Sequence, residues 1–248
     1  MKIYIKNIEL FEKLLHSINR LVPSCKFEID KDKSEIRGFN DSTVIRAFYE
    51  TNIITSDEPI SFCIAKLTNF YKSIQLISEF GDNTTIELDY DGTFIKYSAK
   101  TKFKFSTVKE ETVEKYISPR LKVTLDKTYG CNLTQALMKK LSSLSCISND
   151  DKIKVYIYKE NDSIMGEIDN KQLRISDSIA IPITKDFYGI WDSIIIVTLD
   201  AFRLFNLLDT DSIKCHMTDK KALLIENEIV DKSGNYVKVN LISSILKD

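Results

Sequence analysis

Two stretches of this sequence share one pattern of apolar and polar residues. The first is SFCIAKLTNFYKSIQL, residues 61–76, and the second is SIIIVTLDAFRLFNLL, residues 193–208, at a shift of 132 positions (193 − 61). The matched apolar positions are Leu67, Phe70 and Leu76 in the first copy and Leu199, Phe202 and Leu208 in the second. In both copies an apolar run leads directly into apolar residues at helical spacing. The pattern predicts a strand followed by a helix, present twice in the chain.

A second pair of segments supports an internal repeat. One apolar face at helical spacing is formed by Leu10, Leu14, Ile18 and Leu21, and a similar one by Leu133, Leu137, Leu141 and Leu144. Their shift is 123 positions (133 − 10), and insertions in surface loops would absorb the difference from the first pair. Each half of the chain is therefore expected to contain a helix, several strands, a strand with a second helix, and further strands.

Alternating apolar and polar residues predict the strands of both halves. The expected ranges are 25–30, 34–38, 43–50, 60–65, 84–90, 93–98 and 102–107, then 152–159, 163–168, 171–175, 179–184, 193–198, 212–218, 221–226 and 235–242. Asp91-Gly92 predicts a hairpin turn, and Asp169-Asn170 and Asp219-Lys220 predict further turns. This order predicts an α+β protein with antiparallel sheets, because a parallel nucleotide-binding sheet would alternate strands and helices.

The charged run 109–115 and Pro119 mark a boundary between the two halves. We therefore expect a first repeat over 1–110, a linker over 111–121 and a second repeat over 122–248. Hydrophobic residues make up 43% of the chain and charged residues 29%, which is typical of a soluble globular protein. With no long apolar run and no signal-peptide pattern at its start, the chain is expected in the cytoplasm or the nucleus, away from membranes.

The sequence contains little that indicates catalysis. His16 and His216 are its two histidines, and neither has the spacing of a metal-ligand pair. The seven glycines are scattered, so no glycine-rich phosphate loop is present, and the five cysteines are expected to be reduced and mostly buried. We expect no metal, no cofactor and no enzymatic activity. A hydrolase or transferase of unrelated α+β fold is the open alternative, and it would need clustered acids or a metal.

The repeat and several local strings resemble the PCNA-type sliding clamps, including the two-domain clamps of T4-like phages. The string IRGFNDSTVIRAF, residues 36–48, resembles the clamp segment in which one strand ends in an Asp-Ser turn and the next begins with a hydrophobic residue. Residues 62–76 resemble the second clamp helix with its lead-in strand. The low glycine and proline content favours a phage or another virus, so the compartment would be the bacterial host cytoplasm or, for a eukaryotic virus, the nucleus.

This resemblance implies a homotrimeric ring with helices lining the hole and strands forming an outer layer that is closed by edge-to-edge pairing between subunits. It implies a DNA polymerase processivity factor that encircles double-stranded DNA without reading its sequence. The implied partners are a DNA polymerase, a clamp loader and further copies of the chain. The alternative is a clamp-fold factor that holds DNA on an open basic face as a monomer or dimer.

The solvent faces of the four helices would then contact DNA. Their predicted DNA-binding residues are Lys13, His16, Arg20, Lys66, Lys72, Lys139, Lys140 and Arg203. The other residues expected to face outward are Glu12, Asn19, Asn69, Ser73, Gln135 and Asn206, with Glu12 and Asp200 as the acids of these faces. Such a positive lining attracts phosphates and permits sliding. The same residues also fit the ordinary solvated faces of amphipathic helices, and the charges alone do not choose between the two.

A pocket for the apolar anchors of a partner peptide is expected near the linker. Its candidate walls are Val113, Tyr116, Ile117 and Pro119 together with Ile245 and Leu246 near the C-terminal end. The alternative is a linker whose apolar residues pack onto the two domains.

Overall fold

The structure is a computed structural model that describes residues 1–80, 85–99, 102–120, 124–143, 153–169 and 178–245. The chain divides into two compact units. Unit 1 contains Met1–Asp41, Arg46–Arg120 and Glu228–Val239, and unit 2 contains Ser42–Ile45, Leu121–Asn227 and Asn240–Asp248. The segment Glu228–Val239 lies within the predicted second repeat, 122–248, but belongs to unit 1 by its contacts.

The described elements follow the same order twice. The first series is β1(Lys2–Ile5), α1(Ile8–Leu21), β2(Cys25–Ile29), β3(Ser34–Asn40), β4(Ile45–Thr51), β5(Ile54–Ser56), β6(Ile60–Ile64), α2(Leu67–Phe80), β7(Ile86–Tyr90), β8(Phe94–Ser98) and β9(Lys102–Ser106). The second is β10(Lys127–Leu133), α4(Gln135–Ser143), β11(Lys154–Glu160), β12(Ser163–Asp169), β13(Ser178–Thr184), β14(Phe187–Tyr188), β15(Ile195–Thr198), α5(Leu199–Arg203), β16(Ile213–Thr218), β17(Ala222–Val230) and β18(Tyr236–Ser244). Between them lie α3(Glu110–Val113) and η1(Glu114–Tyr116). The predicted repeat is therefore confirmed.

The order of strands within the sheets repeats as well. Unit 1 contains the sheet β5-β1-β7-β8-β9. Its counterpart has the order β14-β10-β16-β17-β18, of which unit 2 contains β14, β10, β16, residues 222–227 of β17 and residues 240–244 of β18. The order β4-β3-β2-β6 in unit 1 corresponds in the same way to β13-β12-β11-β15 in unit 2. The recorded strand pairs are antiparallel, as in Ile3↔Leu88 and Cys131↔Cys215. This arrangement confirms the α+β prediction of antiparallel sheets with two helices in each repeat.

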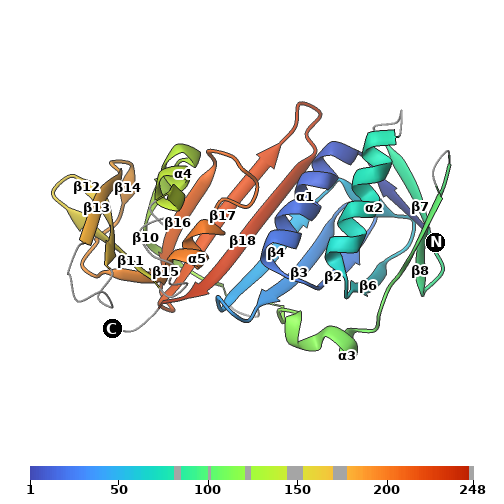
Figure 1. Ribbon diagram of the computed structural model, residues 1–248, viewed down its shortest axis with the longest axis horizontal. Helices are drawn as coiled ribbons and strands as arrows, with labels where there is room; N and C mark the ends of the chain where they lie inside the picture. Colours follow the sequence, from blue (N-terminus) through green and yellow to red (C-terminus); the bar gives the residue numbers. More distant parts are fainter. Residues whose placement is uncertain (81–84, 100–101, 121–123, 144–152, 170–177, 246–248) are drawn as a thin grey trace. The chain divides into compact units, whose positions relative to one another are not determined.

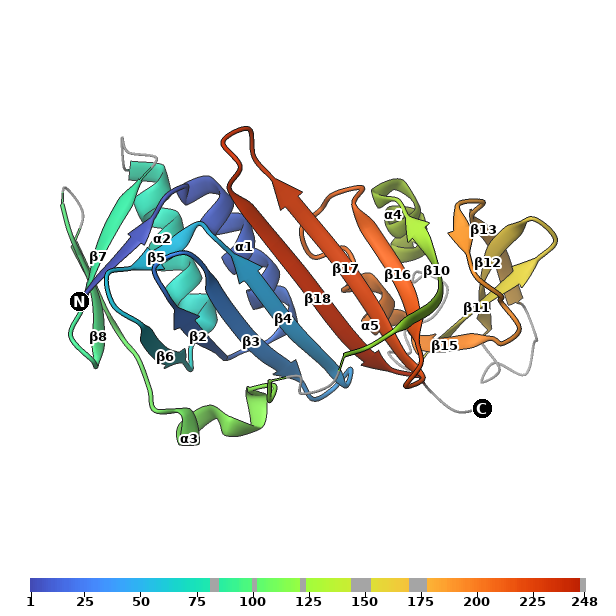
Figure 2. The same cartoon turned by 180° about the vertical axis from the view of Figure 1, so that it is seen from behind.

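In unit 1, α1 and α2 lie side by side and cover one face of the strands β2, β3, β4 and β6 (Figures 1 and 2). Asn7 is the N-cap of helix α1, and its side-chain oxygen accepts a 3.0 Å hydrogen bond from the backbone N–H of Leu10. Its buried face includes Leu14 and Ile18, and α2 buries Phe70. The apolar spacing read from the sequence therefore marks the core side of both helices.

The turn predicted at Asp91-Gly92 is also confirmed, and it joins β7 to β8. Gly92 has a φ of +93°, which a residue without a Cβ atom adopts at low cost. The side chain of Asp91 accepts hydrogen bonds from the backbone N–H groups of Thr93 and Phe94 at 3.0 and 2.7 Å. This Asx arrangement satisfies the backbone groups of the turn.

The fourth predicted helix is shorter than expected. Helix α5 ends at Arg203, and the chain then turns while Phe205, Leu207 and Leu208 remain buried. Asn206 was expected to face solvent, but it is buried, and its side-chain oxygen accepts a hydrogen bond from the backbone N–H of Thr210. The outward assignment of Asn206 is therefore wrong, because the helix itself does not continue past Arg203.

Other differences come from short elements and from one helix face. The strands β1, β5, β10 and β14 were not predicted. Leu76, assigned to the apolar stripe of α2, is 49% exposed. The predicted strand 171–175, the turn residue Asn170 and Leu144 lie outside the described residues. No described helix has the length and apolar character needed to cross a membrane.

Candidate nucleic-acid interface and partner surface

Helices α1 and α2 run antiparallel along their line of contact. The hydroxyl of Thr68, near the start of α2, donates a 2.8 Å hydrogen bond to the side chain of Asn19, near the end of α1. One turn further along, the rings of His16 and Tyr71 have their centroids 5.7 Å apart. The two helices therefore present one continuous solvent-facing surface in unit 1.

The predicted cations of unit 1 lie on this surface. Lys13, His16 and Arg20 of α1 are exposed, as are Lys66, which precedes α2, and Lys72 within it. Asn69 is also exposed, and Asn19 and Ser73 are half-buried between or beside these residues. The structure thus brings together five of the predicted DNA-binding side chains, four within the pair of helices and Lys66 directly before α2.

The acidic residues of the helix pair gather toward its opposite end. Glu12 is half-buried, and Glu9 and Glu79, which the sequence analysis did not assign to these faces, are exposed. Because the helices are antiparallel, the start of α1 lies beside the end of α2, so Glu9 and Glu79 are at the same end. The charge is therefore separated along the pair rather than uniform. Glu9 lies one helical turn before Glu12, and Glu79 lies two turns after Lys72. Helical spacing could therefore have placed both acids on the solvent faces of the helices.

The helices that the structure describes in unit 2 carry fewer cations. Lys139 and Lys140 of α4 are exposed, and Gln135 is half-buried. The guanidinium of Arg203 is paired with the carboxylate of Asp200 at 2.9 Å, an i,i+3 pair within α5. This internal pair reduces the charge that Arg203 offers to a phosphate, although exposed pairs of this kind are weak.

The residues predicted to line the partner pocket differ in their exposure to solvent. Val113 is 3% exposed and belongs to the core of unit 1, so its side chain presents no free surface. Tyr116 and Ile117 are half-buried, and Pro119 is exposed. Ile245 is half-buried, and Leu246 lies outside the described residues. The linker therefore packs onto unit 1 through Val113 and keeps Tyr116, Ile117 and Pro119 partly accessible.

A charged network holds the linker against the strands β2 and β3. Arg37, which is only 7% exposed, donates from Nη1 to the backbone carbonyl of Ser118 at 3.0 Å. Its Nη2 lies 3.0 Å from Oε2 of Glu28, and the same oxygen accepts a 3.0 Å hydrogen bond from Arg120. Lys26 reaches Glu110 at 2.6 Å. Both ends of the linker segment Glu110–Arg120 are thus tied to the same sheet face.

The ionised form of Glu28 is favoured by this network. Its partial desolvation alone would raise its pKa, but the hydrogen bond from Arg120 and the charges of Arg37 and Lys26 outweigh it and lower the pKa. Within the described residues, Nε of Arg37 and the hydroxyl of Ser118 are buried without a hydrogen-bond partner. The carboxylate of Glu28 is the group that joins Arg37 of β3 to Arg120 of the linker.

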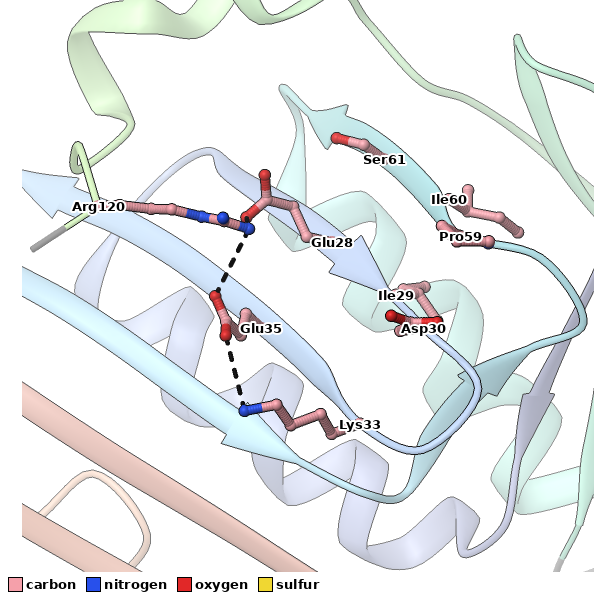
Figure 3. A pocket seen from close by; sticks show the side chains of 9 residues that line it. All are labelled: Glu28, Ile29, Asp30, Lys33, Glu35, Pro59, Ile60, Ser61 and Arg120. Atoms are coloured by element: carbon pink, nitrogen blue, oxygen red, sulfur yellow. Dashed lines mark hydrogen bonds and ion pairs between the residues drawn. The ribbon is translucent and has the colours of Figure 1, made fainter.

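A pocket of about 300 Å³ lies beside this network on unit 1. Figure 3 shows Arg120 reaching toward Glu28 and Glu35 at one side and Lys33 beside Glu35. Ile29, Asp30, Pro59, Ile60 and Ser61 complete its lining. The pocket is lined by both apolar and charged side chains. It therefore differs from the apolar pocket that was predicted for the anchor residues of a partner peptide.

His216 occupies a buried position in β16. Its Nδ1 lies 2.8 Å from the hydroxyl of Tyr188 and its Nε2 lies 2.9 Å from Oε2 of Glu226. The hydrogen bond between His216 and Glu226, together with the nearby charge of Lys127, outweighs desolvation and lowers the pKa of Glu226 to about 2. Every polar atom of the imidazole therefore has a structural partner.

The other reactive side chains are also structural in character. Cys25, Cys63, Cys131 and Cys215 are free and buried, and burial raises the pKa of the Cys25 thiol well above its ordinary value. Cys146 lies outside the described residues. Among the described residues, no group of three or more His, Cys, Asp or Glu side chains is placed to hold a metal ion.

Solved structures of several PCNA proteins are similar to this chain over its full length. A. fulgidus PCNA, bound to the C-terminal region of FEN-1, has a TM-score of 0.76 at 16% identity, covering 100% of this chain and 99% of that chain. Entamoeba histolytica PCNA has a TM-score of 0.73 at 13% identity, covering 99% of this chain and 98% of that one. The PCNA2–PCNA3 complex of Sulfolobus tokodaii has a TM-score of 0.65 at 11% identity, covering 99% of both chains.

This full-length likeness shows that the chain has the fold of the PCNA-type sliding clamps. The predicted resemblance to that class is therefore confirmed at the level of fold. No protein-family model matches the sequence, and no curated protein matches it by sequence.

Proposed function

We propose that this protein is a non-catalytic sliding clamp that encircles double-stranded DNA as a homotrimer and tethers a replicative DNA polymerase. The observation that carries the proposal is the doubled arrangement of helices and strands, in which β9 of the first half and β13 of the second lie at sheet edges. The clamp fold supports the class of function, and the surfaces described above support the individual roles.

Ring closure follows from the correspondence between the repeats. The last strand of the second repeat, β18, pairs with β4 of the first, while their counterparts β9 and β13 are the ends of their sheets. An open sheet edge needs a partner or protection, and a head-to-tail contact that closes on rotation produces a ring. We propose that β9 of one copy pairs with β13 of the next, repeating within the assembly the pairing of β18 with β4.

DNA contact is assigned to the helix surfaces. The exposed cations of α1 and α2 and of α4 would lie opposite phosphates inside the ring, where they neutralise charge without reading bases. Such diffuse contacts permit movement along the duplex. The acids Glu9 and Glu79 limit the positive surface to part of the helix pair and should make DNA binding weak outside the ring.

Partner binding is assigned to the exposed part of the linker. Tyr116, Ile117 and Pro119 remain partly accessible while the charged network holds the segment in place. The PCNA of A. fulgidus was solved with a bound region of FEN-1, which supports a peptide-binding role for proteins of this fold. We assign the polymerase and a clamp loader to this surface. The proposed viral origin, and with it the host cytoplasm or nucleus as compartment, stays a prediction.

The proposal is tested by retention on DNA of defined topology. The protein is loaded onto a nicked circular plasmid, separated from free protein, and the DNA is then cut at one site. A ring remains on the circle through high salt and leaves after linearisation, because its link to DNA is topological. A protein released equally from circular and linear DNA, with strong salt dependence, would instead be an open basic-face binder.

A further inference from the structure

The strand β6 ends the strand order β4-β3-β2-β6 and leaves part of its outer edge open. On its inner side it pairs with β2, as in Phe27↔Phe62. On its outer side, the backbone N–H of Val108 donates a 3.0 Å hydrogen bond to the carbonyl of Cys63. Backbone groups alternate in direction along a strand, so the N–H and C=O of Ser61 face the same outer side. Among the described residues, neither backbone group of Ser61 has a hydrogen-bond partner.

Two pockets of unit 1 meet at this open position, and the exposed residue Ser61 lines both of them. One is the pocket of about 300 Å³ beside Arg120, whose apolar wall is formed by Ile29, Pro59 and Ile60. The other has a volume of about 500 Å³, and its apolar wall is formed by Phe62, Tyr90 and Val108. Figure 3 shows Pro59, Ile60 and Ser61 in succession at the start of β6. The outer edge of β6 therefore has an apolar wall on each side of Ser61.

A second polypeptide backbone is the group that complements Ser61 at this edge. A residue opposite Ser61 in an added antiparallel strand would donate its N–H to the carbonyl of Ser61 and accept from the N–H of Ser61. Its two neighbours would lie opposite Ile60 and Phe62, with their side chains on the same face as these two residues. Ile60 and Phe62 are buried, and each belongs to one of the two apolar walls. The edge therefore fits an extended segment with apolar residues at two alternate positions.

The end of this edge beside Pro59 is acidic. Asp30 lines the smaller pocket together with Pro59, and Asp57 and Glu58 directly precede Pro59 in the chain. All three acids are exposed, and none of them forms an ion pair among the residues that the structure describes. An added antiparallel strand would pass Pro59 with its C-terminal end. A lysine or arginine at that end would complement the three carboxylates.

The linker of the same chain is held away from this position. Val108 pairs with β6, and continued antiparallel pairing would place Glu110 opposite Ser61. Glu110 instead begins α3 and binds Lys26 at 2.6 Å, and Val113 at the end of α3 is buried in the core. The linker therefore leaves the edge before it reaches Ser61, and a strand at that position must come from another molecule.

We propose that the outer edge of β6 binds an extended peptide of a partner protein, which adds to the sheet as an antiparallel strand. The peptide residue opposite Ser61 makes two backbone hydrogen bonds, an apolar residue lies on each side of it, and a lysine or arginine follows the second apolar residue. The site uses neither the helix surface nor Tyr116, Ile117 and Pro119. It also leaves free the edges β9 and β13 that close the proposed ring.

The probe is the synthetic peptide acetyl-Ala-Val-Thr-Val-Lys-Lys-amide, whose threonine is designed to lie opposite Ser61. It is titrated into the isotope-labelled full-length protein, and NMR follows the backbone amide signals, of which that of Ser61 should shift until binding saturates. N-methylation of the peptide's threonine should weaken binding about tenfold, because a backbone hydrogen bond is lost. Ser61→Pro should weaken it about tenfold for the same reason, and Ser61→Ala, which keeps the backbone N–H, is the matched control.

Three results would overturn the proposal. These are equal binding of the peptide and its N-methylated form, shifts confined to β9 or β13, and no shift of the Ser61 signal at millimolar peptide. The N-methylated peptide tests the edge in the unmodified protein, so the outcome does not depend on whether Ser61→Pro folds. Ala180→Pro, on β13, should leave peptide binding unchanged. Solution mass is measured for the same variants, so a failure of the ring is distinguishable from a failure of this site.

Discussion

The phenol of Tyr236 donates a 3.1 Å hydrogen bond to the carboxylate of Glu50, although the two residues are 186 positions apart in the chain. The side chain of Asn52 accepts a 2.8 Å hydrogen bond from the backbone N–H of Tyr236. Both contacts lie within unit 1 and place the start of β18 beside the end of β4. In the proposed contact between copies, β9 of one copy would lie beside β13 of the next in the same way.

We predict that Ala180→Pro lowers the trimer population at least tenfold at a fixed protein concentration. Ala180 is exposed on β13, and a proline there removes one backbone donor from the ladder. Prolines in strands occur where their missing N–H faces an open edge, and Pro182 lies two positions further along β13. Ala180 N–H should therefore face the same edge.

The assembly of this variant is measured by sedimentation equilibrium. Ala180→Ser retains the backbone N–H and is the control that should assemble normally. Thermal unfolding monitored by circular dichroism shows whether the variant is still folded, so that a loss of assembly can be distinguished from a loss of folding. If Ala180→Pro folds and still forms trimers with unchanged affinity, β13 is not the subunit edge.

The cations of α1 and α2 should act additively and weakly. We predict that Lys13→Ala, Lys66→Ala and Lys72→Ala each reduce DNA affinity only a few-fold. The triple variant should lower the slope of log affinity against log salt by about three, because each lysine contributes about one released counterion. Fluorescence anisotropy on a short duplex at several salt concentrations measures both quantities.

Lys33→Ala is the control for that series, because Lys33 is also exposed but lies on the linker side of the sheet, beside Glu35. It should leave the salt slope unchanged. One single variant that abolished binding in a folded protein would contradict a diffuse surface and would indicate a specific contact.

The linker network predicts different effects for two of its members. Glu28→Gln should destabilise the protein by about 2 kcal/mol, because it leaves the buried guanidinium of Arg37 without its carboxylate. Arg120→Ala should cost less than about 1 kcal/mol, because Arg120 is largely exposed. Urea unfolding measures both, and hydrogen exchange should show faster opening of residues 110–120 in Glu28→Gln. Equal effects of the two variants would refute the assigned importance of Arg37.

Glu226 should make stability depend on pH in acid. Its pKa is lowered from 4.5 to about 2 in the folded protein, so the stabilisation is complete above about pH 4.5 and is lost as pH falls toward 2. We predict that Glu226→Gln costs about 1 kcal/mol at pH 7 and progressively less below pH 4.5. Denaturant unfolding at pH 7 and pH 3 compares the variant with the unmodified protein. A difference that is constant over this range would show that the charge of Glu226 is not the cause.

The parts of the fold that could be predicted from the sequence are those in which a periodic pattern coincides with burial. The helical spacing of Leu10, Leu14 and Ile18 reports a face that packs on a sheet, and these residues are buried in the structure. Alternation along β7 and β11 likewise reports sheets with one covered face. Because these patterns occur in both halves of the chain, the internal repeat could be predicted from the sequence.

The parts that could not be predicted depend on tertiary contacts. β5 and β14 have three and two residues, too few for a period to appear, and pair with β1 and β10. The end of α5 at Arg203 is set by a turn in which Asn206 accepts from Thr210, and apolar spacing continues through that turn. The clusters around Glu28 and His216 join residues far apart in sequence and leave no local signal.

The candidate DNA surface was partly predictable for the same reason. Lys13, His16 and Arg20 follow from the helical spacing of α1 alone, because they occupy the face opposite its buried leucines. The separation of cations from Glu9 and Glu79 requires the antiparallel contact of α1 with α2, which the sequence does not specify. The burial of Val113 likewise depends on how the linker meets unit 1.

The central claim is the closed ring, and light scattering over a concentration series tests it most directly. The account predicts a species of about three times the chain mass of 28.6 kDa, which dissociates to smaller species on dilution. A protein that remains a monomer at every concentration, with correctly folded secondary structure, would contradict a self-closing trimeric ring.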